Sequence, residues 1–130
     1  MPVVQIPSIV DEATKRSAVV WVQIDAADHL VWQLWHEGRM YVVSGGIEQP
    51  LPRATSAVVA VRSKERQGDL LVRWVAEVDR VEPGSTLWDE VVPLLHTRRL
   101  NPPDGEEQPR RWARESVVYR FTPTGETLPL

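Results

Sequence analysis

The stretch LVWQLWHEGRMYVVSGG, residues 30–46, holds two apolar runs on either side of a short polar centre. The first run, 30–36, places successive side chains on opposite faces, as the residues of a β-strand do. Glu37-Gly38 forms a two-residue connector, and its glycine allows the positive φ that such turns require. The second run, 39–46, returns as the partner strand. The stretch therefore predicts a β-hairpin whose second arm ends at a glycine pair.

Further strands are expected before and after this hairpin. Four segments are rich in β-branched and aromatic residues: 17–25, 56–64, 70–81 and 116–123. Such residues suit a pleated and half-buried surface. The polar segment DAADH is expected to turn the chain after the first strand. In segment 70–81 the side chains alternate most clearly between an apolar face and a face that mixes apolar and charged residues. With the two hairpin arms this makes six strands in mostly antiparallel succession, which cover their edges most simply by closing into a small barrel.

After the fifth predicted strand the apolar residues recur at the spacing of a helix, and one main helix is expected over 83–100. Thr86 and Asp89 resemble a capping box, and Pro93 is expected to kink or divide the helix. Arg98 and Arg99 suit its C-terminal end, where partial negative charge accumulates.

A helical turn is expected at 110–115. We expect one domain over 1–130, with an N-terminal arm at 1–14 and a frayed C-terminal tail at 124–130.

Composition excludes several classes of protein. The net charge of −3 argues against a nucleic-acid binder, because such proteins draw their affinity from phosphate neutralisation. There is no cysteine for a disulfide or a thiolate metal site. No leader-like N-terminus and no apolar run of about 18 residues is present, so a soluble, cytoplasmic chain without membrane contact is expected. The three histidines, His29, His36 and His96, lack metal-site spacing, so no metal centre is expected.

The order of these elements resembles the FMN-binding split β-barrel family, typified by pyridoxamine 5′-phosphate oxidase. The segments that carry the likeness are AVVWVQID, LVWQLWHEGRMYVVS, AVVAVRSK, LLVRWVAEV, the helix LWDEVVPLLHTRRL and SVVYRFTP. The resemblance implies a mainly β, six-stranded antiparallel split barrel with one or two helices. Family members are usually homodimers that hold FMN or a deazaflavin at the subunit interface. The resemblance therefore implies a flavin- or deazaflavin-dependent oxidoreductase of unknown substrate, acting as a homodimer.

The resemblance also implies which residues hold the cofactor. Ser44 falls where the family places a phosphate-binding hydroxyl, and Arg62, Lys64 and Arg73 fall on strands that often carry basic ligands. The Gly45-Gly46 backbone and the Trp35 ring would approach the flavin ring. No residue stands out as a general acid or base.

Each of these residues also has a purely structural interpretation. The glycine pair can serve strand geometry alone, and the basic residues can be solvated and balanced by Glu65, Asp69 and Glu77. Trp32 and Trp74 are expected in the core, and Trp35 and Trp112 in a dimer interface. We expect the basic run RRWAR (110–114) to form ion pairs with DGEE (104–107).

The chain departs from the family after the strand that ends at Ser44. Many flavin-binding members have a lysine there, whereas this chain has Glu48 nearby. A carboxylate repels a phosphate unless a cation neutralises it. The alternative is therefore a split-barrel homodimer that has lost its cofactor and acts as a binding or structural module.

Overall fold

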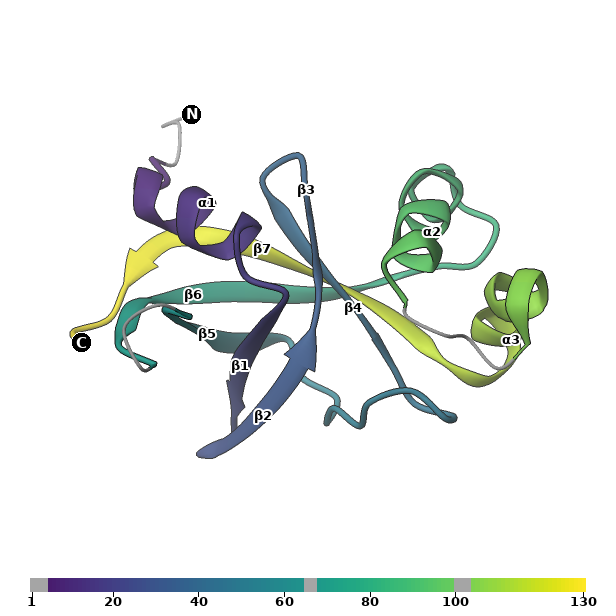
Figure 1. The fold of residues 1–130 in the computed structure, drawn as a ribbon, viewed down its shortest axis with the longest axis horizontal. Coiled ribbons are helices and arrows are strands. Elements are labelled where there is room, and N and C mark those ends of the chain that lie inside the picture. The colour runs from purple at the N-terminus through teal and green to yellow at the C-terminus, as the bar shows by residue number, and fades with distance from the viewer. Residues whose placement is uncertain (1–4, 65–67, 100–103) are drawn as a thin grey trace.

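The computed structural model describes residues 5–64, 68–99 and 104–130, which form one seven-stranded antiparallel sheet and three α-helices (Figure 1). In chain order the elements are α1 (Ser8–Lys15), β1 (Val19–Ile24), β2 (Ala27–Trp32), β3 (Leu34–His36), β4 (Arg39–Ser44), β5 (Ser56–Arg62), β6 (Leu70–Val81), α2 (Thr86–Arg98), a 3₁₀ turn (Gly105–Glu107), α3 (Gln108–Glu115) and β7 (Val117–Thr127). Figure 1 shows α1 at one end of the curled sheet and α2 with α3 at the other. None of the described helices is long and apolar enough to cross a membrane.

The order of strands in the sheet explains the barrel. Neighbouring strands follow the order β2-β1-β5-β6-β7-β4-β3, so β2 and β3 are the two edges. These edge strands are separated in the chain by one residue, Gln33. The sheet must therefore curl until its two edges meet at this residue. Gln33 is buried there, and its amide donates to the carbonyl oxygens of Thr14 and Ser17 at the end of α1.

The predicted hairpin is confirmed as β3 and β4, with His36 opposite Arg39. Glu37 and Gly38 have φ values of 49° and 77°, the pair of positive angles that a type I′ turn requires. The strand expected over 30–36 is interrupted at Gln33. β1 and β2 are joined by Asp25 and Ala26 alone, so the turn is shorter than DAADH.

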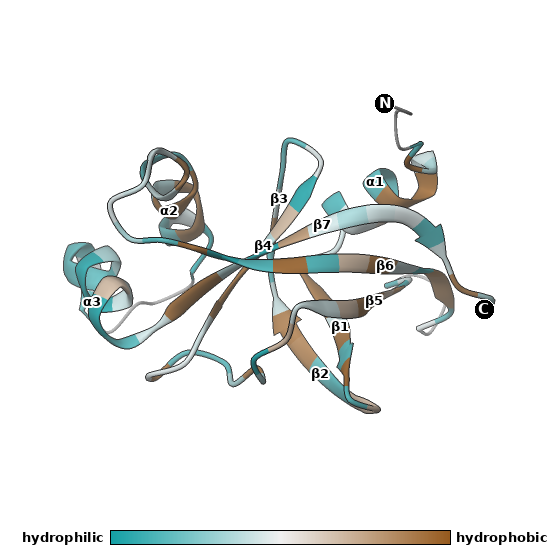
Figure 2. Ribbon diagram, turned by 180° about the vertical axis from the view of Figure 1, so that it is seen from behind, coloured by the Kyte–Doolittle hydropathy of each residue, from teal (hydrophilic) through white to brown (hydrophobic). Residues whose placement is uncertain are grey.

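The apolar residues form two cores. One fills the barrel and includes Val22, Met40, Trp74 and Phe121. The other lies between the sheet and the helices α2 and α3, and includes Trp88, Val91 and Trp112. The run MYVV in β4 is continuously apolar because its residues alternate between these two cores, which leaves both faces buried. Figure 2 shows the corresponding brown stretches along the strands.

The split-barrel fold is confirmed, with seven strands in place of six. The extra strand arises because the first arm of the hairpin is divided into β2 and β3. The predicted alternation of β6 is also confirmed, since Val72, Trp74, Ala76 and Val78 are all buried.

Three local predictions are corrected by the structure. α2 runs through Pro93 as one helix, so the proline does not divide it. Its N-cap is Ser85, whose hydroxyl accepts a hydrogen bond from the Trp88 N–H, so the cap lies one residue before Thr86. The tail is not frayed over 124–127, because β7 continues there along β6. The segment 1–14, which was expected to be an N-terminal arm, contains most of α1.

Candidate functional site

The face of the sheet turned away from the barrel carries exposed apolar side chains. Leu30, Trp21, Ala60 and Arg73 are consecutive partners across β2, β1, β5 and β6, and directly paired residues project to the same face. We call this side of the four strands the outer face. Leu30 is 52% exposed, and Val19, Leu71 and Trp21 also contribute apolar surface. Apolar patches of this kind are typical of interaction surfaces.

A cavity of about 260 Å³ lies beside the outer face, where β1 begins, β2 ends and α2 ends. We call it the Trp32 pocket, and its lining residues are Ala18, Val19, Trp32, Gln33, Arg98 and Arg99. The pocket is lined by one tryptophan and two arginines, of which Arg99 is paired with Glu48. This combination suits a ligand that has a flat, weakly polar body and an anionic group.

The walls of the Trp32 pocket are held in place by specific contacts. The Gln49 side-chain amide accepts from the Trp32 N–H at 2.9 Å and donates to the Trp32 carbonyl oxygen at 3.0 Å. It thereby pairs with the open edge of β2 as a neighbouring strand would. The Trp32 ring packs against the buried Trp112 at a centroid distance of 6.4 Å. Arg98 donates through Nε to the Gln33 carbonyl oxygen at 2.9 Å.

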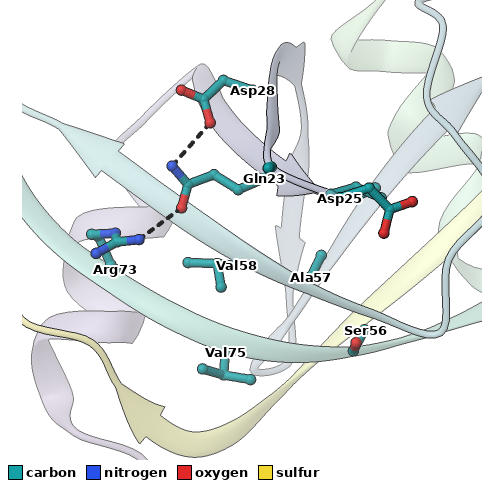
Figure 3. A pocket seen from close by; sticks show the side chains of 10 residues that line it. Gln23, Asp25, Asp28, Ser56, Ala57, Val58, Arg73 and Val75 are labelled. Atoms are coloured by element: carbon teal, nitrogen blue, oxygen red, sulfur yellow. Dashed lines mark hydrogen bonds between the residues drawn. The ribbon is translucent and has the colours of Figure 1, made fainter.

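A second cavity, of about 470 Å³, contains the predicted ligand Arg73 (Figure 3). Gln23 lies between two charged side chains there: it accepts from Arg73 Nη2 at 3.0 Å and donates to Asp28 at 2.9 Å. Arg73 also donates to the Pro129 carbonyl oxygen. The guanidinium therefore donates to two neutral acceptors, and no carboxylate among the described residues pairs with it.

A third cavity, of about 270 Å³, contains the other two predicted basic ligands, Arg62 and Lys64. Arg16 at the end of α1 also lines this cavity, as does the acidic residue Glu12. Arg62 donates to the Gly68 carbonyl oxygen at 2.8 Å. The structure thus places Arg62 and Lys64 together but puts Arg73 in a different cavity.

The segment Ser44-Gly45-Gly46 lies beneath the end of α3 and lines none of these three cavities. Ser44 is buried, and the Gly45 N–H donates to the Gln49 carbonyl oxygen. A Cβ on Gly46 would come within 3.2 Å of the Glu115 carbonyl oxygen. The glycine pair therefore provides the close approach of two chain segments.

The tryptophans are distributed differently from the prediction. Trp35 is partly buried, donates through Nε1 to Asp11 at 2.7 Å and packs edge-to-face on Trp74. Trp112 is fully buried within the chain, so the expectation that it lies in a dimer interface is wrong. Trp32 was expected in the core, yet it is only half-buried and lines a cavity.

Glu48 is neutralised within the chain. Its side chain is 1% exposed and accepts from Arg99 at 3.0 Å and from Arg111 at 3.2 Å. Arg111 also donates twice to Asp104, which confirms the predicted pairing between RRWAR and DGEE. The hydrogen bond from Arg111 lowers the pKa of Asp104, and the same bond raises the pKa of the guanidinium. Four charged side chains thus tie the β4–β5 connection to α2 and α3.

The comparisons with known proteins identify the fold. No family model and no curated protein matches the chain. The crystal structure of HutZ, described as the heme storage protein from Vibrio cholerae, matches with a TM-score of 0.65 over 95% of this chain and 94% of HutZ. The two sequences are 14% identical, so the likeness establishes the fold alone. The chain therefore has a split-barrel fold.

Sequence reasoning did not single out Arg98 and Arg99 as candidate ligands. In the sequence they form a basic pair at the end of an amphipathic helix, where such residues are common. Their approach to Trp32 depends on the path of a chain segment of more than sixty residues, for example 65 between Arg98 and Gln33. The polar Gln33, beside Trp32 in an otherwise apolar strand, was the one signal in the sequence.

Proposed function

We propose that the chain forms a homodimer through its outer face and binds a planar, anionic cofactor in the Trp32 pocket. FMN or a phosphorylated deazaflavin is the cofactor that we favour, in an oxidoreductase of unknown substrate. The observation that carries this proposal is the meeting of a half-buried indole with two arginines at the rim of an exposed apolar sheet face. In this proposal the cofactor supplies the hydride or electron transfer, and the protein supplies binding and orientation.

The residues of the pocket fit the parts of such a cofactor. A flat ring system can pack on Trp32 and Val19, and Arg98 can donate to a phosphate. Arg98 is exposed and makes no ion pair with any carboxylate in the described part of the chain. Its charge is therefore available to a ligand without breaking an existing pair.

The size of the pocket supports a role for a second subunit. About 260 Å³ is just below the range of about 300–1000 Å³ that is typical of ligand pockets. Val19 belongs both to the pocket wall and to the exposed apolar surface of the outer face. A second copy docked on the outer face would cover both and enlarge the cavity.

The likeness to HutZ makes heme an alternative ligand to test. Heme iron is usually held by a histidine, cysteine, methionine or tyrosine, and none of these lines the Trp32 pocket. His29 has a buried Nε2 with no hydrogen-bond partner in the described structure, but it lies opposite the core residue Val22. Its ring therefore faces the barrel side of β2 and not the outer face. This argues for a flavin over heme.

A cofactor-free module remains the second candidate function, and one observation favours it. Glu48, in the segment where the family grips phosphate, is saturated by Arg99 and Arg111 of the same chain. That segment is therefore closed by internal ion pairs, and any cofactor phosphate must bind elsewhere.

Ligand titration distinguishes these possibilities. The purified chain would be titrated with FMN, a phosphorylated deazaflavin and hemin, with tryptophan fluorescence and visible absorption as readouts. Arg98→Ala should weaken FMN binding by about 1.5–3 kcal/mol, roughly 10- to 150-fold in Kd. Arg110→Ala is the matched control, because that arginine is 77% exposed on α3 and lines none of the three cavities. If none of the three ligands binds, the cofactor proposal is wrong and the cofactor-free module stands.

The dimer is tested separately. Leu30→Glu introduces a charge at a position that is already 52% exposed, so the monomer should fold normally. We expect size-exclusion chromatography with light scattering to report a dimer for the parent chain and a monomer for this variant. Leu94→Glu, on the exposed side of α2, should remain dimeric. A monomeric parent chain would disprove the proposed interface.

A further inference from the structure

We propose that His36, Glu37 and Glu90 form a binding site for a divalent transition-metal ion. The site lies where the β3–β4 turn meets α2. It does not depend on the proposed cofactor or on the dimer. No metal site was expected from the sequence, because the histidines lack metal-ligand spacing within any one segment.

The three donors come together from two separate elements. His36 ends β3, Glu37 begins the turn, and Glu90 lies on α2, 54 residues after His36. One ligand atom from each of the three side chains lies within 4.8 Å of the other two. Donors bound to one ion at about 2.0–2.2 Å are at most about 4.4 Å apart. Small rotations of these side chains are therefore enough to place all three on one ion.

The imidazole is already turned toward a carboxylate. His36 Nε2 is 3.1 Å from Glu90 Oε2, and the histidine side chain is only 24% exposed. The nitrogen that would bind the ion thus faces the carboxylates from a partly buried position. Two exposed carboxylates alone would bind a metal ion weakly. The imidazole adds a third donor that already points toward one of them.

The charge of the cluster also favours a cation. Two carboxylates and one imidazole carry a net negative charge, and like charges at such short range repel each other. Among the described residues, no lysine or arginine forms an ion pair with Glu37 or Glu90. Arg39, opposite His36 in the hairpin, makes no ion pair with either carboxylate in the same residues. A bound divalent ion would remove this repulsion.

The donor set indicates the class of metal. One imidazole and two carboxylates suit zinc, manganese, iron or cobalt, whereas calcium and magnesium prefer oxygen donors alone. Three protein ligands leave at least one coordination position for water or a substrate. The site would therefore be open, and it would also link the tip of the hairpin to α2.

The test uses the full chain after treatment with a chelator. We expect isothermal titration with zinc chloride to show one bound ion per chain, and cobalt chloride to give visible absorption bands of a protein-bound ion. His36→Gln and Glu90→Gln should each weaken zinc binding about tenfold or more. His29→Gln removes a histidine outside the cluster and should bind zinc like the parent chain.

Two outcomes would overturn the proposal. One is the absence of zinc binding by the parent chain at millimolar metal. The other is equal binding by the parent, His36→Gln and Glu90→Gln chains, which would place the ion elsewhere. Glu37→Gln provides an independent check, because the residue is exposed in the turn and loss of its carboxylate should also weaken zinc binding.

Discussion

Removal of the guanidinium of Arg111 should destabilise the chain substantially. Arg111 donates to Asp104 at 2.7 and 3.1 Å and to Glu48 at 3.2 Å. Its side chain is 9% exposed and that of Glu48 is 1% exposed, so this pair is shielded from water. Arg111→Met keeps much of the apolar stem but leaves the Glu48 carboxylate with Arg99 as its partner among the described residues.

The magnitude follows from these contacts. Breaking a buried ion pair by removal of one partner costs about 3–5 kcal/mol. We expect a value near the lower end, about 3 kcal/mol, because Arg99 still contacts Glu48 and because Asp104, at 27% exposure, can be rehydrated. For a chain of this length, that loss corresponds to a fall in Tm of about 10 °C.

Urea and thermal unfolding of the parent and variant chains provide the assay. The matched control is Arg110→Met, which removes an exposed ion pair with Glu107 and should cost less than about 1 kcal/mol. In the double variant Glu48→Gln/Arg111→Met the two effects should be non-additive, because the buried carboxylate that loses its Arg111 partner is no longer present. If Arg111→Met is as stable as the Arg110→Met control, the reasoning about a shielded network is refuted.

Three further predictions concern capping and pH. Ser85→Ala removes the hydroxyl that accepts from the Trp88 N–H and should lower the free energy of unfolding by about 1 kcal/mol in urea titrations; an unchanged midpoint would count against the cap. The hydrogen bond from Arg111 lowers the pKa of Asp104 below 3.8, so its stabilisation is present above that pH and is lost as the pH falls further. In the Asp104→Asn variant, the free energy of unfolding should therefore fall less steeply at acid pH than in the parent chain. Parallel curves of the free energy of unfolding against pH for the two chains would contradict this. Burial raises the pKa of Tyr41 above 10.0, so the stability that its neutral form provides is lost as the pH rises beyond that value. Tyr41→Phe should remove a late-titrating phenol from the ultraviolet absorption titration of the folded chain. A titration of the parent chain without such a late phenol would disprove this prediction.

Short-range patterns were sufficient to predict much of the fold. The positive φ that Glu37-Gly38 adopts, the alternation of β6 and the ion pairs between RRWAR and DGEE all depend on residues that are close in the sequence. Turn chemistry and strand periodicity act over a few residues, so they can be recognised without the structure. The order of these elements, together with the resemblance, was enough to indicate a split barrel.

The division of the hairpin arm at Gln33 was decided only by the tertiary structure. This residue interrupts a strand that appears continuous, because the two edges of the curled sheet meet there and its side chain bonds to the end of α1. Trp32 was expected in the core and Trp112 at an interface, whereas Trp112 is buried and Trp32 is only half-buried, and this difference has a similar cause. Both rings are equally apolar, and only the packing of α2 and α3 determined which ring is buried.

The candidate sites depend on tertiary structure to an even greater degree. Arg98 reaches the Gln33 carbonyl across 65 residues, Arg111 reaches Glu48 across 63, and Glu90 reaches His36 across 54. The sequence by itself determined which side chains can bind anions or cations and which segments form strands. Their convergence is a property of the closed barrel, because the energy that positions these charges comes from the burial of apolar residues elsewhere in the chain.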